Sequence, residues 1–162
     1  MKKITVLCAV LFAVVITLTA CSSNESNESV GDTTDKTAQE LLDTVLNSIE
    51  FPQIVDVTDE DRIEDMGVDL SIAEDHAIVQ QMLSVDVVEV IILKVKDGEI
   101  NKAVEDLKAR RESLINDFAF YPEQVESANA TVVGSEQDIA YLICHVDAAQ
   151  AEEKLIEEIN AK

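Results

Sequence analysis

The sequence predicts a single α+β domain in which helices pack on a mainly antiparallel sheet of about four strands. Apolar residues recur at helical spacing in three segments: residues 37–49, residues 100–118 and the segment from residue 148 onwards. A β-branched run over residues 85–95 is apolar on both faces, which is typical of a central strand covered on each side. Two short apolar segments at residues 130–133 and 139–146, separated by a polar turn, predict a β-hairpin.

The first 20 residues have the features of an export signal. Lys2 and Lys3 form a positive segment, and a nearly unbroken apolar run follows at residues 4–16. This run is shorter than the roughly 20 residues that a transmembrane helix needs. The next residues, Leu18-Thr19-Ala20-Cys21, match the lipobox of bacterial lipoproteins. This resemblance implies cleavage before Cys21 and attachment of diacylglycerol to its sulfur.

A lipid on Cys21 would hold the mature chain at the cell membrane with its domain on the extracytoplasmic face. Residues 21–35 are then the lipidated cysteine and a disordered tether, because Val30 is the only apolar residue between Ser22 and Asp35. The single α+β domain is expected at residues 36–162. It would contain one cysteine, Cys144, and therefore no internal disulfide.

The first half of the domain carries clear helix boundaries. Thr37 and Glu40 have the spacing of a capping box, which predicts a helix that ends before Phe51-Pro52. The segment Thr58 to Met66 predicts a short acidic helix that Gly67 terminates.

The second half predicts strands, helices and a hairpin in alternation. Two strand candidates, residues 76–83 and 85–95, are followed by a turn at Asp97-Gly98. A helix from Ile100 to Phe118 comes next, and the predicted hairpin and a final acidic helix from Ala148 complete the chain.

The charge balance excludes a nucleic-acid partner. The chain has 33 acidic and 12 basic side chains, a net charge of −21. Removing Lys2 and Lys3 with the leader makes the mature chain more negative still, at −23. Carboxylates in this excess repel phosphates instead of releasing their counterions.

The residues that usually carry catalysis or metal binding are few, and we expect no catalytic site, metal site or cofactor. Cys144 and His145 are neighbours on a predicted strand, so they point to opposite faces and cannot pair. Cys144 is expected to be a buried apolar residue, His145 a partly exposed one, and His76 has no partner nearby in sequence. The acidic segment from Asp59 fails as an EF-hand loop, because Ile63 occupies a ligand position.

Basic residues are concentrated in one region and form a candidate interaction surface. Six of the ten basic residues in the mature chain lie between residues 94 and 111: Lys94, Lys96, Lys102, Lys108, Arg110 and Arg111. Two interpretations remain open for them. They either pair with acidic residues of the same chain, or they form a basic surface for an anionic partner, including anionic lipid.

Several segments together resemble a family of small Gram-positive lipoproteins whose single module is a domain of unknown function. They are the lipobox, the strand Val87 to Asp97, Tyr121-Pro122-Glu123-Gln124 and Ala140-Tyr141-Leu142-Ile143. The resemblance covers about residues 36–160. It implies a lipid on Cys21 and assigns no activity and no catalytic residue.

These observations favour a membrane-anchored extracytoplasmic lipoprotein that acts as a non-catalytic binding module of the cell envelope. Its partner would be an envelope protein or a small ligand, and the lipid on Cys21 would bind the membrane. The alternative is an envelope enzyme of the hydrolase type, with or without a cation. It requires His76, His145 or Cys144 in a cleft beside acidic residues, and Tyr121 could then contribute.

Overall fold

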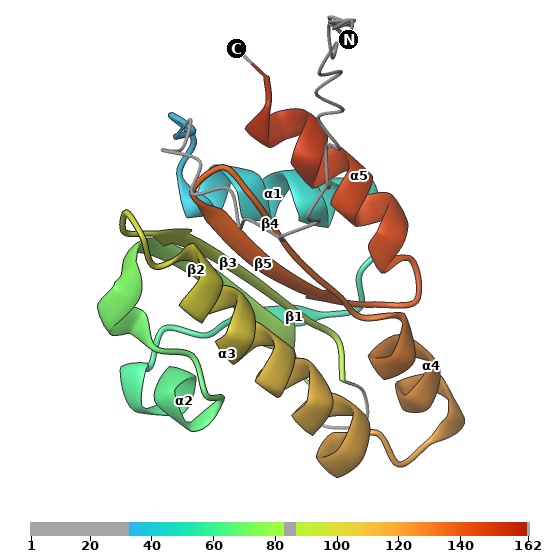
Figure 1. The fold of residues 1–162 in the computed structure, drawn as a ribbon. Coiled ribbons are helices and arrows are strands. Elements are labelled where there is room, and N and C mark those ends of the chain that lie inside the picture. The colour runs from blue at the N-terminus through green and yellow to red at the C-terminus, as the bar shows by residue number, and fades with distance from the viewer. Residues whose placement is uncertain (1–32, 83–86, 162) are drawn as a thin grey trace, which may run out of the picture.

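The computed structural model describes residues 33–82 and 87–161, and these residues form the predicted α+β architecture (Figure 1). The strands are β1 (Ile54–Asp56), β2 (Ala73–Gln81), β3 (Glu89–Val95), β4 (Val132–Glu136) and β5 (Ile139–Cys144). The helices are α1 (Ala38–Ser48), α2 (Glu60–Asp65), α3 (Ile100–Ser113), α4 (Pro122–Ala130) and α5 (Ala148–Ile159). A 3-10 turn at Leu70–Ile72 and a π-helical turn at Leu114–Phe118 complete the elements. The predicted signal, Cys21, most of the tether and residues 83–86, where the two predicted strands meet, lie outside the described residues.

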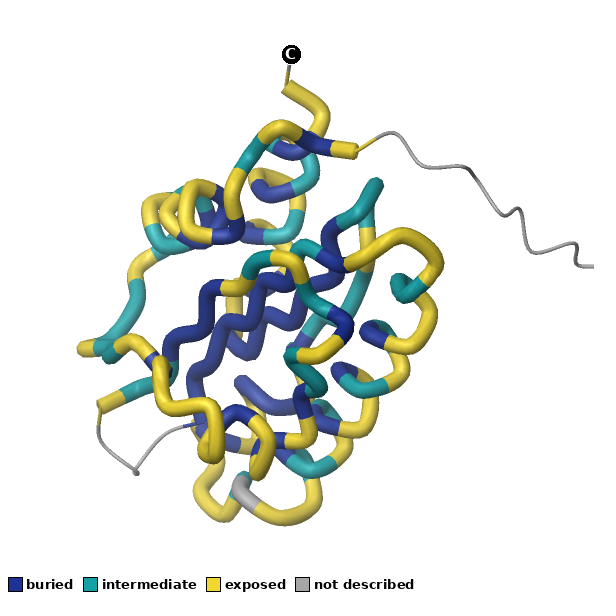
Figure 2. Tube along the Cα trace, turned by 90° about the vertical axis from the view of Figure 1, so that its left-hand side faces the viewer, coloured by how far each residue is buried: buried dark blue, intermediate teal, exposed yellow. Residues whose placement is uncertain are grey.

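The strands form one antiparallel sheet in the order β1-β2-β3-β5-β4. β3 is therefore the central strand, which confirms the prediction made from its β-branched run. Ile91 of β3 lies between Ile78 of β2 and Leu142 of β5, and all three are buried. The strand residues form the buried centre of the molecule in Figure 2.

Helices cover both faces of this sheet. On one face, Ile91, Leu93 and Leu142 join Leu107 of α3 in a single apolar core, to which α2 and α4 also contribute. On the other face, Val90, Ile92 and Ile143 join residues of α1 and α5. Alternate residues of β3 thus enter two different cores, because successive side chains of a strand point to opposite faces.

Local sequence signals set several helix ends as predicted. The Thr37 hydroxyl accepts a hydrogen bond from the Glu40 N–H (3.2 Å), and the Glu40 carboxylate accepts one from the Thr37 N–H (2.9 Å). This reciprocal pair is the capping box of α1. Gly67 follows α2 with a φ of +80°, a left-handed conformation that glycine adopts without steric cost.

Two elements, β1 and α4, are additional to the prediction. β1 has only three residues, too few to show a period of two, and it pairs with β2 at the edge of the sheet. α4 buries Gln124, Ser127 and Ala128, none of which is a large apolar residue. Its inner face therefore lacks the apolar pattern from which a helix is predicted.

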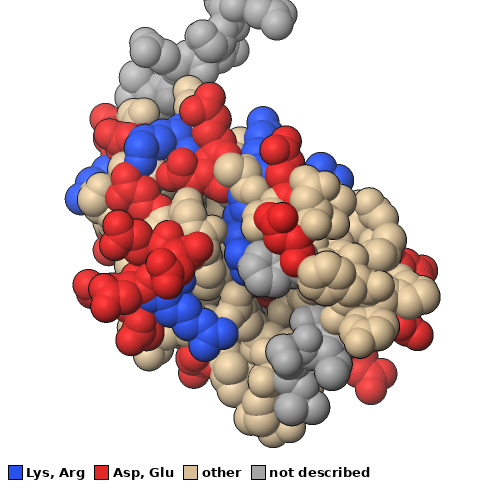
Figure 3. Space-filling model, turned by 90° about the horizontal axis from the view of Figure 1, so that it is seen from below, with Lys and Arg blue, Asp and Glu red and all other residues tan. Residues whose placement is uncertain are grey.

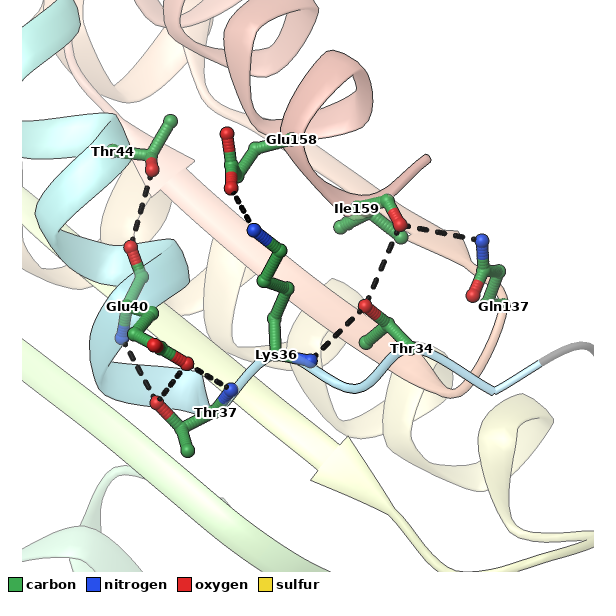
Figure 4. Close-up of polar contacts among 8 residues, drawn as sticks. All are labelled: Thr34, Lys36, Thr37, Glu40, Thr44, Gln137, Glu158 and Ile159. Carbon is green, nitrogen blue, oxygen red and sulfur yellow. Dashed lines mark hydrogen bonds and ion pairs between the residues drawn. The ribbon is translucent and has the colours of Figure 1, made fainter. Parts of the chain in front are cut away.

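The first described residues contact the folded domain through a segment we call the N-terminal junction (residues 34–36). The Thr34 N–H donates to Asp138 Oδ1 (2.9 Å), and its hydroxyl donates to the Ile159 carbonyl (3.4 Å). The Lys94 ammonium donates to the Thr34 carbonyl (2.6 Å), and Lys36 pairs with Glu158, as Figure 4 shows in part. These contacts are polar, so the polar composition that predicts a tether through residue 35 does not reveal them.

Among the residues that the structure describes, no helix is both long enough and apolar enough to cross a membrane.

Candidate functional site

Arg110, one of the six basic residues of the candidate surface, lies inside the protein. It is 8% exposed, and its Nε and Nη2 donate to the two carboxylate oxygens of Glu89 at 3.0 and 2.7 Å. Glu89 is 2% exposed and also accepts a hydrogen bond from the Gln80 amide (2.6 Å). This cluster ties α3 to the sheet and presents no cation to a partner.

The remaining five basic residues have different environments. Lys94 contacts the N-terminal junction, and Lys96 donates to the Ser71 carbonyl (2.7 Å). Arg111 Nε donates to the Thr131 carbonyl (3.0 Å), Lys102 pairs with Asp69 and Asp106, and Lys108 is exposed. The structure thus does not bring the six residues together on one surface, and the partners of most of them belong to the same chain.

Lys102 lies in the wall of an open acidic groove of about 570 Å³ between α2, the 3-10 turn and α3. Its titratable lining residues are Glu60, Glu64, Asp69, Asp106 and Lys102. Within residues 33–82 and 87–161, no three His, Cys, Asp or Glu side chains are placed to hold a metal ion.

The lysine controls the ionisation of its neighbour in this groove. Hydrogen bonds from Lys102 and then from Ser71 lower the pKa of the Asp69 carboxyl from its ordinary 3.8 to about 2. Because the pKa of Asp69 is lower in the folded chain than in the unfolded chain, its ionised carboxylate stabilises the fold at a pH above 3.8. This contribution disappears as the pH falls from 3.8 through about 2.

We therefore expect Lys102→Met to move the Asp69 titration midpoint upward from about 2 toward 3.8. The midpoint should remain below 3.8, because the Ser71 hydrogen bonds persist. Carboxyl ¹³C NMR titration measures it directly. Lys108→Met, an exposed change in the same helix, is the control and should leave the midpoint unchanged; an equal midpoint in both variants contradicts the assignment.

Cys144, His145 and His76 occupy three different environments. Cys144 is fully buried in the core beneath α3, as predicted. His145 is 7% exposed, so the prediction of a partly exposed side chain is wrong: its ring packs 5.0 Å from that of Phe51, and Nδ1 accepts from the Asp147 N–H (3.0 Å). His76 is exposed on β2. None of the three lines the acidic groove.

The structure exposes a group of apolar side chains at the start of α4, which we call the apolar tip (Phe120, Tyr121 and Val125). These side chains are 76%, 62% and 41% exposed. The sequence does not predict this surface, because an aromatic residue beside proline is usually packed. Its only signal is the juxtaposition of two aromatic residues in a segment that lacks apolar periodicity.

The apolar tip and the N-terminal junction lie at opposite ends of the β4–β5 hairpin. The junction contacts Asp138 in the hairpin turn, whereas α4 ends at Ala130, one residue before β4 begins at Val132. In Figure 1, α4 lies at the lower right, and α1 and the end of α5 lie at the top. A hairpin of this length separates its ends by roughly 17–20 Å.

Comparison with known protein families matches residues 47–145 to a domain of unknown function, DUF4358. The chain belongs to this family. The DUF4358 match contains every strand of the sheet together with α2, α3 and α4. It thus includes the apolar tip, whereas α5 and most of α1 lie outside it. No curated protein and no solved structure matches the chain.

Proposed function

We propose that this DUF4358 protein is a lipid-anchored, extracytoplasmic binding module of the cell envelope. Cys21 carries the lipid, the following polar residues form the tether, and the folded domain binds an envelope protein. The observation that carries the proposal is the position of the apolar tip at the end of the domain opposite the N-terminal junction. The lipobox supports the anchor, and the exposed aromatic residues support the binding role.

Exposed apolar side chains grouped on a charged domain are typical of protein interaction sites. Aromatic residues are enriched at the centres of such interfaces, where each large side chain contributes about 1.5–3 kcal/mol when it is fully buried. A chain attached at the N-terminal junction leaves the apolar tip at the membrane-distal end of the hairpin when the junction faces the bilayer. The tip can then reach a partner without competing with the anchor.

The anchor is tested by mass spectrometry of the protein purified from membranes, together with incorporation of an alkyne-tagged fatty acid. We expect an N-terminal peptide that begins at Cys21 and carries the lipid. Cys21→Ala should abolish incorporation of the fatty acid, and Cys8→Ala, a matched change within the leader, should not. An unmodified Cys21, or equal labelling of the two variants, contradicts the proposal.

A further inference from the structure

We infer that the apolar tip docks on a protein whose complementary surface is an apolar pocket rimmed by Lys or Arg side chains. This inference rests on the proposed function and adds to it the chemistry of the partner.

The charged residues that flank the apolar tip in the sequence all have one sign. Residues 112–130 contain four acidic residues and no Lys, Arg or His. The four are Glu112, Asp117, Glu123 and Glu126, and all are exposed. The preceding basic residue, Arg111, is partly buried and directs its Nε to the Thr131 carbonyl. An apolar centre with an acidic rim is complementary to an apolar pocket with a basic rim.

Figure 3 shows the molecule from below, with charged side chains densest on the left and a mostly uncharged surface on the right, where acidic side chains lie at the edge. α4, at the start of which the apolar tip lies, is on the right in Figure 1, and α2 is on the left. A partner can bury this uncharged area without removing many charged groups from water, which would oppose binding.

The same acidic rim disfavours two other occupants. A second copy of the chain would bring an identical rim against the first, and like charges closer than the Debye length of about 8 Å repel. An anionic bilayer surface repels the rim for the same reason. The N-terminal junction, which leads to the anchor, also lies at the other end of the hairpin.

The backbone of the apolar tip is held in place before any partner binds. Gln124 is buried, and its Oε1 accepts hydrogen bonds from the N–H groups of Phe120 (2.8 Å) and Tyr121 (3.0 Å). Both aromatic residues are thus attached to the first turn of α4. A surface ordered in this way loses less conformational entropy on binding than a mobile loop does.

Photo-crosslinking in cells that produce the full lipidated protein identifies the occupant. The photoreactive amino acid p-benzoyl-phenylalanine replaces Tyr121, and in the control it replaces Glu153, which is exposed on α5. We expect one protein, identified by mass spectrometry, to crosslink from position 121 and not from position 153. Crosslinks to a second copy or to lipid, or no protein crosslink at position 121, overturn the inference.

Charge reversal then tests the basic rim with the identified protein after purification. Glu123→Lys with Glu126→Lys should weaken binding at least fivefold, and affinity should fall as salt increases. Glu153→Lys with Glu157→Lys changes the net charge equally on α5 and should have less than a twofold effect. Equal weakening by the two pairs, or no weakening by the first, overturns the inference. A retained lipid on Cys21 and a continued interaction through another surface would leave the proposed function intact.

Discussion

Arg110→Met is expected to lower the free energy of unfolding by about 3–5 kcal/mol, the usual consequence of removing one member of a buried ion pair. The Glu89 carboxylate that Arg110 binds is 2% exposed and lies on the central strand. Without the guanidinium it keeps the Gln80 amide but loses both charged hydrogen bonds. Urea denaturation followed by circular dichroism measures the difference.

A double variant separates the effect of an unpaired buried charge from the effect of changed side-chain packing. Combining Arg110→Met with Glu89→Leu removes both charges, and we expect most of the lost stability to return. Arg111→Met serves as the control for loss of an arginine from the same helix and should cost about 1 kcal/mol, because it removes the hydrogen bond to the Thr131 carbonyl. A cost below 1 kcal/mol for Arg110→Met would show that the pair does not stabilise the fold.

Gly134→Ala is expected to destabilise the protein by about 1–3 kcal/mol, the usual cost of overfilling a packed site. Gly134 on β4 lies directly opposite Tyr141 on β5. A Cβ at this position would lie 2.4 Å from the Tyr141 hydroxyl oxygen and 2.6 Å from the ring carbon that bears it. The ring cannot move away easily, because it is buried and its hydroxyl donates to Glu152 (2.9 Å).

A second change on β5 tests this cause. Tyr141→Leu removes the atoms that the new methyl group meets, so Gly134→Ala should cost less in that background than in the wild type. Ser135→Ala, at the exposed neighbouring position of β4, should change the free energy of unfolding by less than about 0.5 kcal/mol. Additive effects of Gly134→Ala and Tyr141→Leu would contradict the steric explanation.

Much of the fold could be predicted because its signals are local. The capping box at Thr37 and Glu40 and the terminating Gly67 need only adjacent residues, and the central position of β3 follows from its two apolar faces. β1 and α4 could not be predicted in this way. β1 is defined by its pairing with β2, and α4 is held by Gln124 and small residues.

Which side chains lie on the surface depends on contacts between residues far apart in the sequence. Composition does not predict these contacts. In the sequence Arg110 resembles the exposed Lys108, but its helix position places it against Glu89, 21 residues away. Thr34 belongs to a segment with the polar composition of a tether, but it contacts the hairpin turn and the end of α5. Conversely, Phe120 is a large apolar residue, but it lies just before α4 and is exposed.

The most direct test of a module that is anchored at one end and binds at the other compares two lipidated proteins purified from detergent-solubilised membranes. One is the wild type, and the other carries Phe120→Ser and Tyr121→Ser. Fatty-acid labelling measures the anchor. Co-purification of the partner protein, already identified by photo-crosslinking from position 121, measures binding. We predict equal labelling and membrane recovery, with partner recovery at least tenfold lower for the variant. Release of the variant from the membrane, or unchanged recovery of the partner, would contradict the account.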